Sequence, residues 1–303
     1  METTNPADKV RVLSSPNSAL STHVNAYLTL VRVPNCLMIG LAVVVGESIA
    51  LGTFPSLAEA VFGFSTASLL LAGTMVLNDI HDIEVDRVNS PNRPLPSEKI
   101  GIRQAYLLSA ILSILGMISS IILGTFTLLA ATLALVLMIY YNTRGKSTGL
   151  LGNAVVSFNV ALPFFFGGLA VHNLRPLLFI FSVLAFLANM AREIAKGIAD
   201  TAGDSLRRVK TLAVWKGPKT AAWSSASLFA AAVALSFSAP LWDKNVSVFY
   251  YPAVVLADLG FLYSAYRLIR NPKPETAKVV KKHVLVWMFL GLVGFLMGGS
   301  PVL

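Results

Sequence analysis

Nine stretches of this 303-residue chain are long and apolar enough to form helices that cross a lipid bilayer. About 20 apolar residues in a helix span the bilayer core, and a helix satisfies its own backbone polar groups there. Only 13% of the residues are charged, against about 25% in soluble proteins. The sequence therefore predicts an all-α polytopic membrane protein with nine transmembrane helices. The predicted spans are 25–50, 57–77, 104–122, 124–141, 153–172, 176–196, 219–240, 247–267 and 284–301.

The basic residues are distributed unevenly between the two ends of these spans. Of the 24 lysines and arginines, 21 fall in the N-terminal tail and in the stretches 78–103, 142–152, 192–219 and 267–282. Cytoplasmic loops carry an excess of Lys and Arg. We therefore predict a multi-pass protein of the cell membrane, with its N-terminus and long loops in the cytoplasm and its C-terminus outside. The net charge of +9 therefore comes from loops that border the membrane lipids, and we expect no binding of nucleic acid.

Two polar motifs end the second and the sixth predicted spans. Their members are separated by four residues in each case, which places them on one face of a helix. The first motif consists of Asn78, Asp82 and Asp86, and the second of Lys196, Asp200 and Asp204. Ionisable residues at the edge of membrane spans are functional candidates by default.

The two motifs are in register with each other. Corresponding members, such as Asp82 and Asp200, are separated by 118 residues. An even number of spans lies between them, as in repeats related by an axis along the membrane normal. We predict one domain, 1–303, with four-helix pseudo-repeats near 25–141 and 153–267 around a central cavity, and a ninth helix outside the repeats. The motifs should then face each other at one membrane depth.

Carboxylates from both motifs would repel each other across such a cavity. A pair at about 4 Å costs roughly 4 kcal/mol at an effective dielectric constant near 20, and a divalent cation removes this cost. Oxygen ligands without clustered His or Cys favour Mg2+, which usually keeps coordination sites for phosphate oxygens. The predicted metal ligands are Asn78, Asp82, Asp86, Asp200 and Asp204. We expect them to bind a diphosphate through Mg2+.

Basic and polar residues near the motifs complete the predicted site. Lys and Arg match phosphate oxygens as a point charge and as a planar fork. Arg32, inside the first span, is costly there unless it is paired or faces a cavity. The predicted catalytic residues are Asp82, Asp200 and Lys196. The predicted substrate-binding residues are Arg32, Asn35, Arg93, Tyr141, Lys146, Lys196, Arg207 and Arg208.

These motifs resemble the signatures of the UbiA superfamily of intramembrane prenyltransferases. The stretch 78–86, continued by Asn92-Arg93-Pro94-Leu95-Pro96-Ser97, is similar to the first signature, and 196–204 is similar to the second. Arg32-x-Pro34-Asn35 resembles a weaker third element. The resemblance covers nearly the whole chain. It implies Mg2+-dependent transfer of a prenyl group from its diphosphate to an acceptor.

Within this superfamily, two further stretches narrow the resemblance. Arg192-Glu193-Ile194 and Lys210-Thr211-Leu212 look most like archaeal digeranylgeranylglyceryl phosphate synthases. This resemblance implies a geranylgeranyl donor and geranylgeranylglyceryl phosphate as acceptor in ether-lipid synthesis. Gly197 departs from the family pattern, which often has an Asp at that position. The alternatives are a prenyltransferase acting on an aromatic acceptor such as 4-hydroxybenzoate or a quinone precursor and, outside this class, a membrane transporter.

Overall fold

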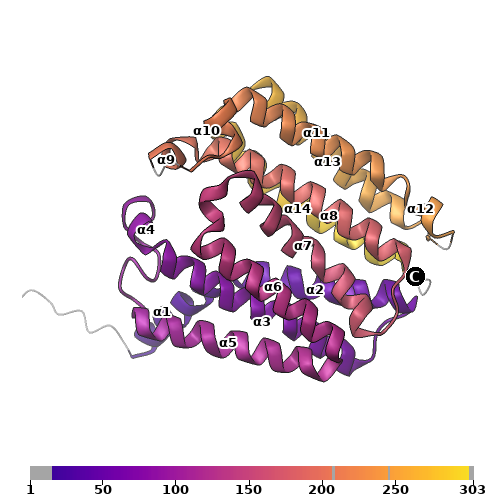
Figure 1. The fold of residues 1–303 in the computed structure, drawn as a ribbon, viewed down its shortest axis with the longest axis horizontal. Coiled ribbons are helices and arrows are strands. Elements are labelled where there is room, and N and C mark those ends of the chain that lie inside the picture. Colours follow the sequence, from indigo (N-terminus) through magenta and orange to yellow (C-terminus); the bar gives the residue numbers. More distant parts are fainter. Residues whose placement is uncertain (1–15, 207–208, 245, 300–303) are drawn as a thin grey trace, which may run out of the picture.

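The computed structural model describes residues 16–206, 209–244 and 246–299, and every regular element in these ranges is a helix. The long helices pack side by side in one bundle (Figure 1). They are α1 (Pro16–Val31), α2 (Val33–Leu51), α3 (Leu57–His81), α5 (Ile102–Leu123), α6 (Thr125–Thr143), α7 (Leu150–Ala170), α8 (Pro176–Ala199), α11 (Pro218–Ser236), α13 (Tyr250–Arg270) and α14 (Pro274–Gly299). The short ones are α4 (Ile83–Asn89), the 3-10 helix η1 (Gly145–Thr148), α9 (Thr201–Leu206), α10 (Leu212–Lys216) and α12 (Ala239–Trp242).

Eight of the described helices are long and apolar enough to cross a membrane, namely α2, α3, α5, α6, α7, α8, α13 and α14. Helix α11 occupies the position of the remaining predicted span. It is rich in Ala and Ser and packs between α8 and α13, with Ala222, Ser225 and Phe229 buried. Small residues allow such close packing of membrane helices. The prediction of an all-α polytopic membrane protein is confirmed.

The first predicted span is not one continuous helix, and the sequence-based placement of Arg32 inside it was wrong. Helix α1 ends at Val31, α2 begins at Val33, and Arg32 between them has a left-handed backbone with φ of 55°. Pro34 has no N–H to donate to the carbonyl of Leu30, which removes a helical hydrogen bond here and favours the break. The break places Arg32 at the wall of the central cavity.

Helices α2 and α7 approach each other closely enough for their backbones to touch. A Cβ atom on Gly167 would lie 2.5 Å from the backbone nitrogen of Glu47. One on Gly46 would lie 2.5 Å from the backbone oxygen of Phe164. Glycine is required at both positions because any other residue would force the helices apart. This crossing joins the first predicted repeat to the second.

A carboxylic acid is enclosed at this crossing. The Glu47 side chain is fully buried, and neither of its oxygens has a hydrogen-bond partner among the described residues. It fits because Gly63 on α3 has no side chain; a Cβ there would lie 2.0 Å from Glu47 Oε1. Glu47 is therefore enclosed by α2, α3 and α7 together.

Candidate active site

A cavity of about 1030 Å³ lies inside the bundle and is lined by residues of both polar motifs. Every predicted site residue within the described ranges lines it. These are Arg32, Asn35, Asn78, Asp82, Asp86, Arg93, Tyr141, Lys146, Lys196, Asp200 and Asp204. The remaining two, Arg207 and Arg208, lie outside the described residues.

The first motif is placed by the end of α3. Asp82 follows the last helical residue, and its backbone N–H donates to the Asn78 carbonyl at 3.1 Å. The backbone N–H of Asp86 in turn donates to the Asp82 carbonyl at 2.8 Å. The i to i+4 spacing therefore continues from α3 into α4. The Asn78 side chain also donates to Asp82 Oδ2 at 3.2 Å, which fixes the orientation of that carboxylate.

The second motif repeats this local geometry 118 residues later. Helix α8 ends at Ala199 as α3 ends at His81, and the backbone N–H groups of Asp200 and Asp204 each donate to the carbonyl four residues earlier, at 3.0 Å. The short helices α4 and α9 contain the last member of each motif, Asp86 and Asp204, and lie at the same end of the bundle (Figure 1). Superposition of the complete four-helix halves stays a prediction.

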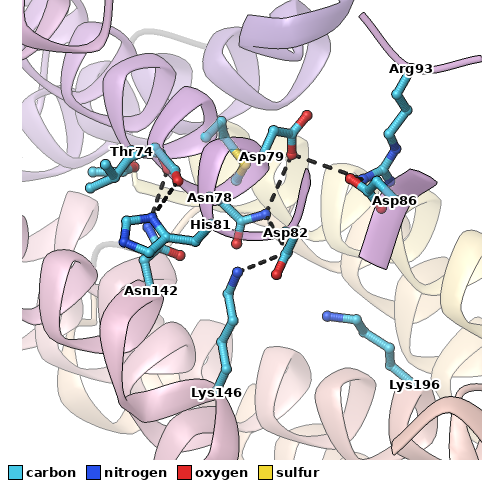
Figure 2. Close-up of polar contacts among 12 residues, drawn as sticks. Thr74, Asn78, Asp79, His81, Asp82, Asp86, Arg93, Asn142, Lys146 and Lys196 are labelled. Atoms are coloured by element: carbon cyan, nitrogen blue, oxygen red, sulfur yellow. Dashed lines mark hydrogen bonds and ion pairs between the residues drawn. The ribbon is translucent and has the colours of Figure 1, made fainter. Parts of the chain in front are cut away.

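The carboxylates of the first motif are each paired with a cation. Lys146 Nζ donates to Asp82 Oδ2 at 2.8 Å, and Arg93 Nη1 donates to Asp86 Oδ2 at 2.5 Å (Figure 2). Burial lowers the pKa of Lys146, and the hydrogen bond to Asp82 opposes that shift. Neighbouring cations therefore already neutralise the carboxylates of the first motif, which the spacing argument did not anticipate. Repulsion between the two motifs stays a prediction.

Asp79 is an acid that the spacing argument missed. It is buried beneath the cavity wall, and its Oδ1 accepts a hydrogen bond from Arg32 Nη2 at 2.5 Å. Asp79 follows Asn78 directly, so it falls outside the four-residue spacing of the motif. Arg32 could have indicated Asp79 from the sequence, because an arginine at a membrane span is unfavourable unless it pairs with an acid.

Glu193 is the second acid that was not assigned to the site. It is buried, and its carboxylate contacts Lys196 Nζ at 3.2 Å and Arg192 Nη1 at 2.8 Å. Glu193 lies one helical turn before Gly197, the position that corresponds to Asp79 in the 118-residue register. The second half thus takes its buried acid from a neighbouring turn of α8. This acid holds Lys196 where the side chain extends toward the first motif (Figure 2).

The side-chain oxygens at the motifs are suited to binding a magnesium ion whose remaining ligands come from a substrate. Within the described ranges, no three His, Cys, Asp or Glu side chains lie close enough to form a protein-only metal cage. Magnesium does not need one, because it is usually bound by one or two carboxylates together with substrate phosphates and water. The cavity offers oxygen atoms of this kind on both sides, from Asn78 and Asp82 on α3 and from Asp200 and Asp204 after α8.

Away from the motifs the cavity is mainly apolar. Its walls there include Phe164, Val254, Leu292 and Phe295. Asp258 is a polar exception: it is buried, and its Oδ2 accepts a hydrogen bond from Ser236 Oγ at 2.7 Å. A charged end joined to an apolar interior is complementary to an amphiphile with an anionic head and a hydrocarbon chain.

Sequence comparisons identify relatives along almost the entire chain. The profile of the UbiA prenyltransferase family matches residues 38–293. The chain is 37% identical over 286 residues to digeranylgeranylglyceryl phosphate synthase of Ignicoccus hospitalis, covering 91% of this chain and 92% of that one. It is 31% identical over 280 residues to the synthase of the same name from Saccharolobus solfataricus, covering 92% and 98%.

Solved structures with the same fold agree with these matches. A structure of digeranylgeranylglyceryl phosphate synthase superposes with a TM-score of 0.75 at 30% identity, over 92% of this chain and 99% of the other. A UbiA homologue from Archaeoglobus fulgidus bound to GPP and Mg2+ superposes with a TM-score of 0.64 at 20% identity, over 89% and 99%. At that identity the second likeness concerns the fold.

Proposed function

The chain belongs to the UbiA prenyltransferase family, and from this premise we propose that it transfers a geranylgeranyl group from its diphosphate to geranylgeranylglyceryl phosphate, with Mg2+ bound at the two polar motifs. Family membership assigns the chain to the prenyltransferases and removes the transporter alternative. The lining of the cavity supports a prenyl diphosphate as substrate. The residues of both polar motifs lie at one end of this cavity, and apolar residues line the rest of it. A prenyl diphosphate has the same division into an anionic head and a hydrocarbon chain.

The cations at the cavity wall account for the departure of the diphosphate. In the transfer, the bond between the allylic carbon and the diphosphate oxygen breaks, and its electron pair leaves with the diphosphate. Lys146, Lys196 and Arg93 supply positive charge where this negative charge develops, and stabilisation of developing charge is usually the largest catalytic term. The acceptor hydroxyl oxygen then bonds to the allylic carbon, and its proton passes to the released diphosphate.

Magnesium, when bound together with the diphosphate, would neutralise further charge on the departing oxygens. Asn78, Asp82, Asp86, Asp200 and Asp204 supply the protein oxygens for it. A UbiA homologue of the same fold binds GPP and Mg2+, which supports the use of Mg2+ together with a prenyl diphosphate. The apolar walls keep water from the cation-like allylic carbon, which water would otherwise consume.

The names of the relatives and the cations of the cavity wall support geranylgeranylglyceryl phosphate as the acceptor. The Ignicoccus and Saccharolobus relatives are both named for a product with two geranylgeranyl groups on glyceryl phosphate. Such an acceptor brings a second phosphate into the cavity beside the donor. Cations on both sides of the described cavity wall, several of them paired with acids, are able to contact two anionic groups. They are Arg32, Arg93, Lys146, Arg192, Lys196, Lys278 and Lys281.

Product analysis tests this proposal. We expect the purified protein with Mg2+ to prenylate geranylgeranylglyceryl phosphate and release diphosphate, with geranylgeranyl diphosphate preferred over shorter donors. Activity should be absent in EDTA and return with added Mg2+. Transfer to 4-hydroxybenzoate with no reaction at the lipid would instead identify an aromatic prenyltransferase. Full activity in EDTA would contradict the role of magnesium.

The membrane orientation is also part of the proposal and has its own test. The basic loops predict that Lys99 faces the cytoplasm and Thr53 the outside. Both are exposed, whereas the native Cys36 is buried. In a Cys36→Ala background, we expect Thr53→Cys to react with a membrane-impermeant thiol reagent in intact cells, and Lys99→Cys to react only after lysis. The opposite pattern would reverse the assigned topology.

A further inference from the structure

The two sides of the cavity mouth differ in their balance of charge. On the first-half side the three acids Asp79, Asp82 and Asp86 are matched by three cations: Arg32 and Arg93 from the same half, and Lys146 from the link that follows it. At the mouth on the second-half side, four cations among the described residues line the cavity, together with three acids. Asp258, a fourth acid of this half, lines the cavity away from the motifs. The cations are Arg192, Lys196, Lys278 and Lys281, and the acids are Glu193, Asp200 and Asp204. Positive charge is thus in excess on this side.

The excess originates from α14, the helix outside the two predicted repeats. Lys278 and Lys281 are three residues apart, on one face of its first turns, and both line the cavity. Helix α14 packs against α8. There the Arg192 side chain Nε donates to the Lys281 carbonyl at 3.3 Å. This contact fixes the end of α14 beside the second motif.

These three side chains are able to receive an anion. Lys281 Nζ lies 3.8 Å from Asp200 Oδ1, which is too long for a hydrogen bond. Arg192 uses Nε and Nη1 in its contacts with Lys281 and Glu193. A guanidinium carries five N–H donors, so Arg192 retains donors for a ligand. Lys278 is exposed at the mouth of the cavity.

We propose that Arg192, Lys278 and Lys281 form the binding site for the phosphate of the acceptor lipid. The proposal rests on the function above, because it requires an acceptor with its own phosphate. Lys146, Arg93 and Lys196 then remain for the diphosphate of the donor between the two motifs. Separating the two anionic heads, with the lipid phosphate at the start of α14, reduces their mutual repulsion. It leaves the donor carbon and the acceptor hydroxyl free to meet between them.

The test is the double variant Lys278→Ala with Lys281→Ala, compared with Lys273→Ala with Lys282→Ala. The control pair removes the same charge from exposed positions nearby that do not line the cavity. We expect the first pair to raise the KM for geranylgeranylglyceryl phosphate by at least about 10-fold, the scale of a lost charge-assisted hydrogen bond. The KM for geranylgeranyl diphosphate should stay within about 2-fold in both pairs.

Equilibrium binding separates this site from general electrostatics and from the function itself. Thermal stabilisation by geranylgeranylglyceryl phosphate alone, without donor, should be lost in the first pair and kept in the control pair. A wild type that uses this lipid, combined with an unchanged first pair or an equally affected control pair, would overturn the site and leave the function intact. A wild type that neither binds nor prenylates the lipid would overturn both.

Discussion

Asp82→Ala and Asp200→Ala are each expected to lower prenyl transfer by on the order of 10³-fold, the scale of removing one group that stabilises developing charge. Each substitution removes carboxylate oxygens from one side of the proposed magnesium and diphosphate site. The measurement is the initial rate of diphosphate release from geranylgeranyl diphosphate at saturating Mg2+. Glu84→Ala serves as the control, because Glu84 is an exposed acid in α4 that does not line the cavity.

The structure also bears on the stability of these variants. Asp82 and Lys146 are each about one quarter exposed, at 24% and 26%. The pair is thus mostly buried, and removing Asp82 leaves the partly desolvated Lys146 ammonium without its partner, at a cost on the order of 1–3 kcal/mol. We expect the melting temperature in detergent to fall by a few degrees. Wild-type rates in Asp82→Ala would remove the first motif from the site, whereas an unfolded variant would show that the ion pair is mainly structural.

Gly167→Ala is expected to disrupt packing of the bundle, whereas Gly291→Ala should leave it unchanged. Both glycines lie inside long helices, so both substitutions gain similar helix propensity, up to about 1 kcal/mol. At Gly167 the added Cβ meets the backbone of α2 at 2.5 Å, while at Gly291 it meets no atom within 4 Å. Such overpacking costs about 1–3 kcal/mol, and more where backbone cannot move.

Melting temperature and the yield of monodisperse protein in detergent measure this difference. We expect a large loss for Gly167→Ala and wild-type behaviour for Gly291→Ala. Equal stability of the two variants would mean that α2 and α7 separate without cost. The contact would then have no part in holding the two halves of the chain together.

The motif residues could be predicted from the sequence because their positions follow from periodicity. Four-residue spacing fixes a helical face, and the offset between Asp82 and Asp200 fixes which faces correspond. The four-residue spacing is a local property of the sequence, and the 118-residue offset is a property of its internal repeat. The break at Arg32 also had a local signal in Pro34, but apolar composition on both sides of it favoured one long span.

The residues that were missed depend on packing between distant helices. Asp79 is part of the site because Arg32, 47 residues earlier in sequence, donates to it. Lys281 lines the cavity because α14 packs against α8. Since α14 lies outside the two repeats, the 118-residue offset does not predict where its residues lie. In the sequence, Glu193 stood out only as part of a stretch that resembles the synthases, with no predicted role in the site. Its role in holding Lys196 required the geometry of α8.

The enclosure of Glu47 has a consequence for the biosynthesis of the protein. When α2 first enters the bilayer it carries a carboxylic acid one turn before its end at Leu51, and ionisable residues inside membrane spans are costly. Helix α3 follows at once and offers Gly63, but α7 emerges about 120 residues later, roughly ten seconds at usual rates of synthesis. During that interval α3 already covers the carboxylate, but the α7 backbone that packs against Glu47 is still absent. The surroundings of this acid are therefore complete only after α7 has inserted, which links its burial to the synthesis of the second half.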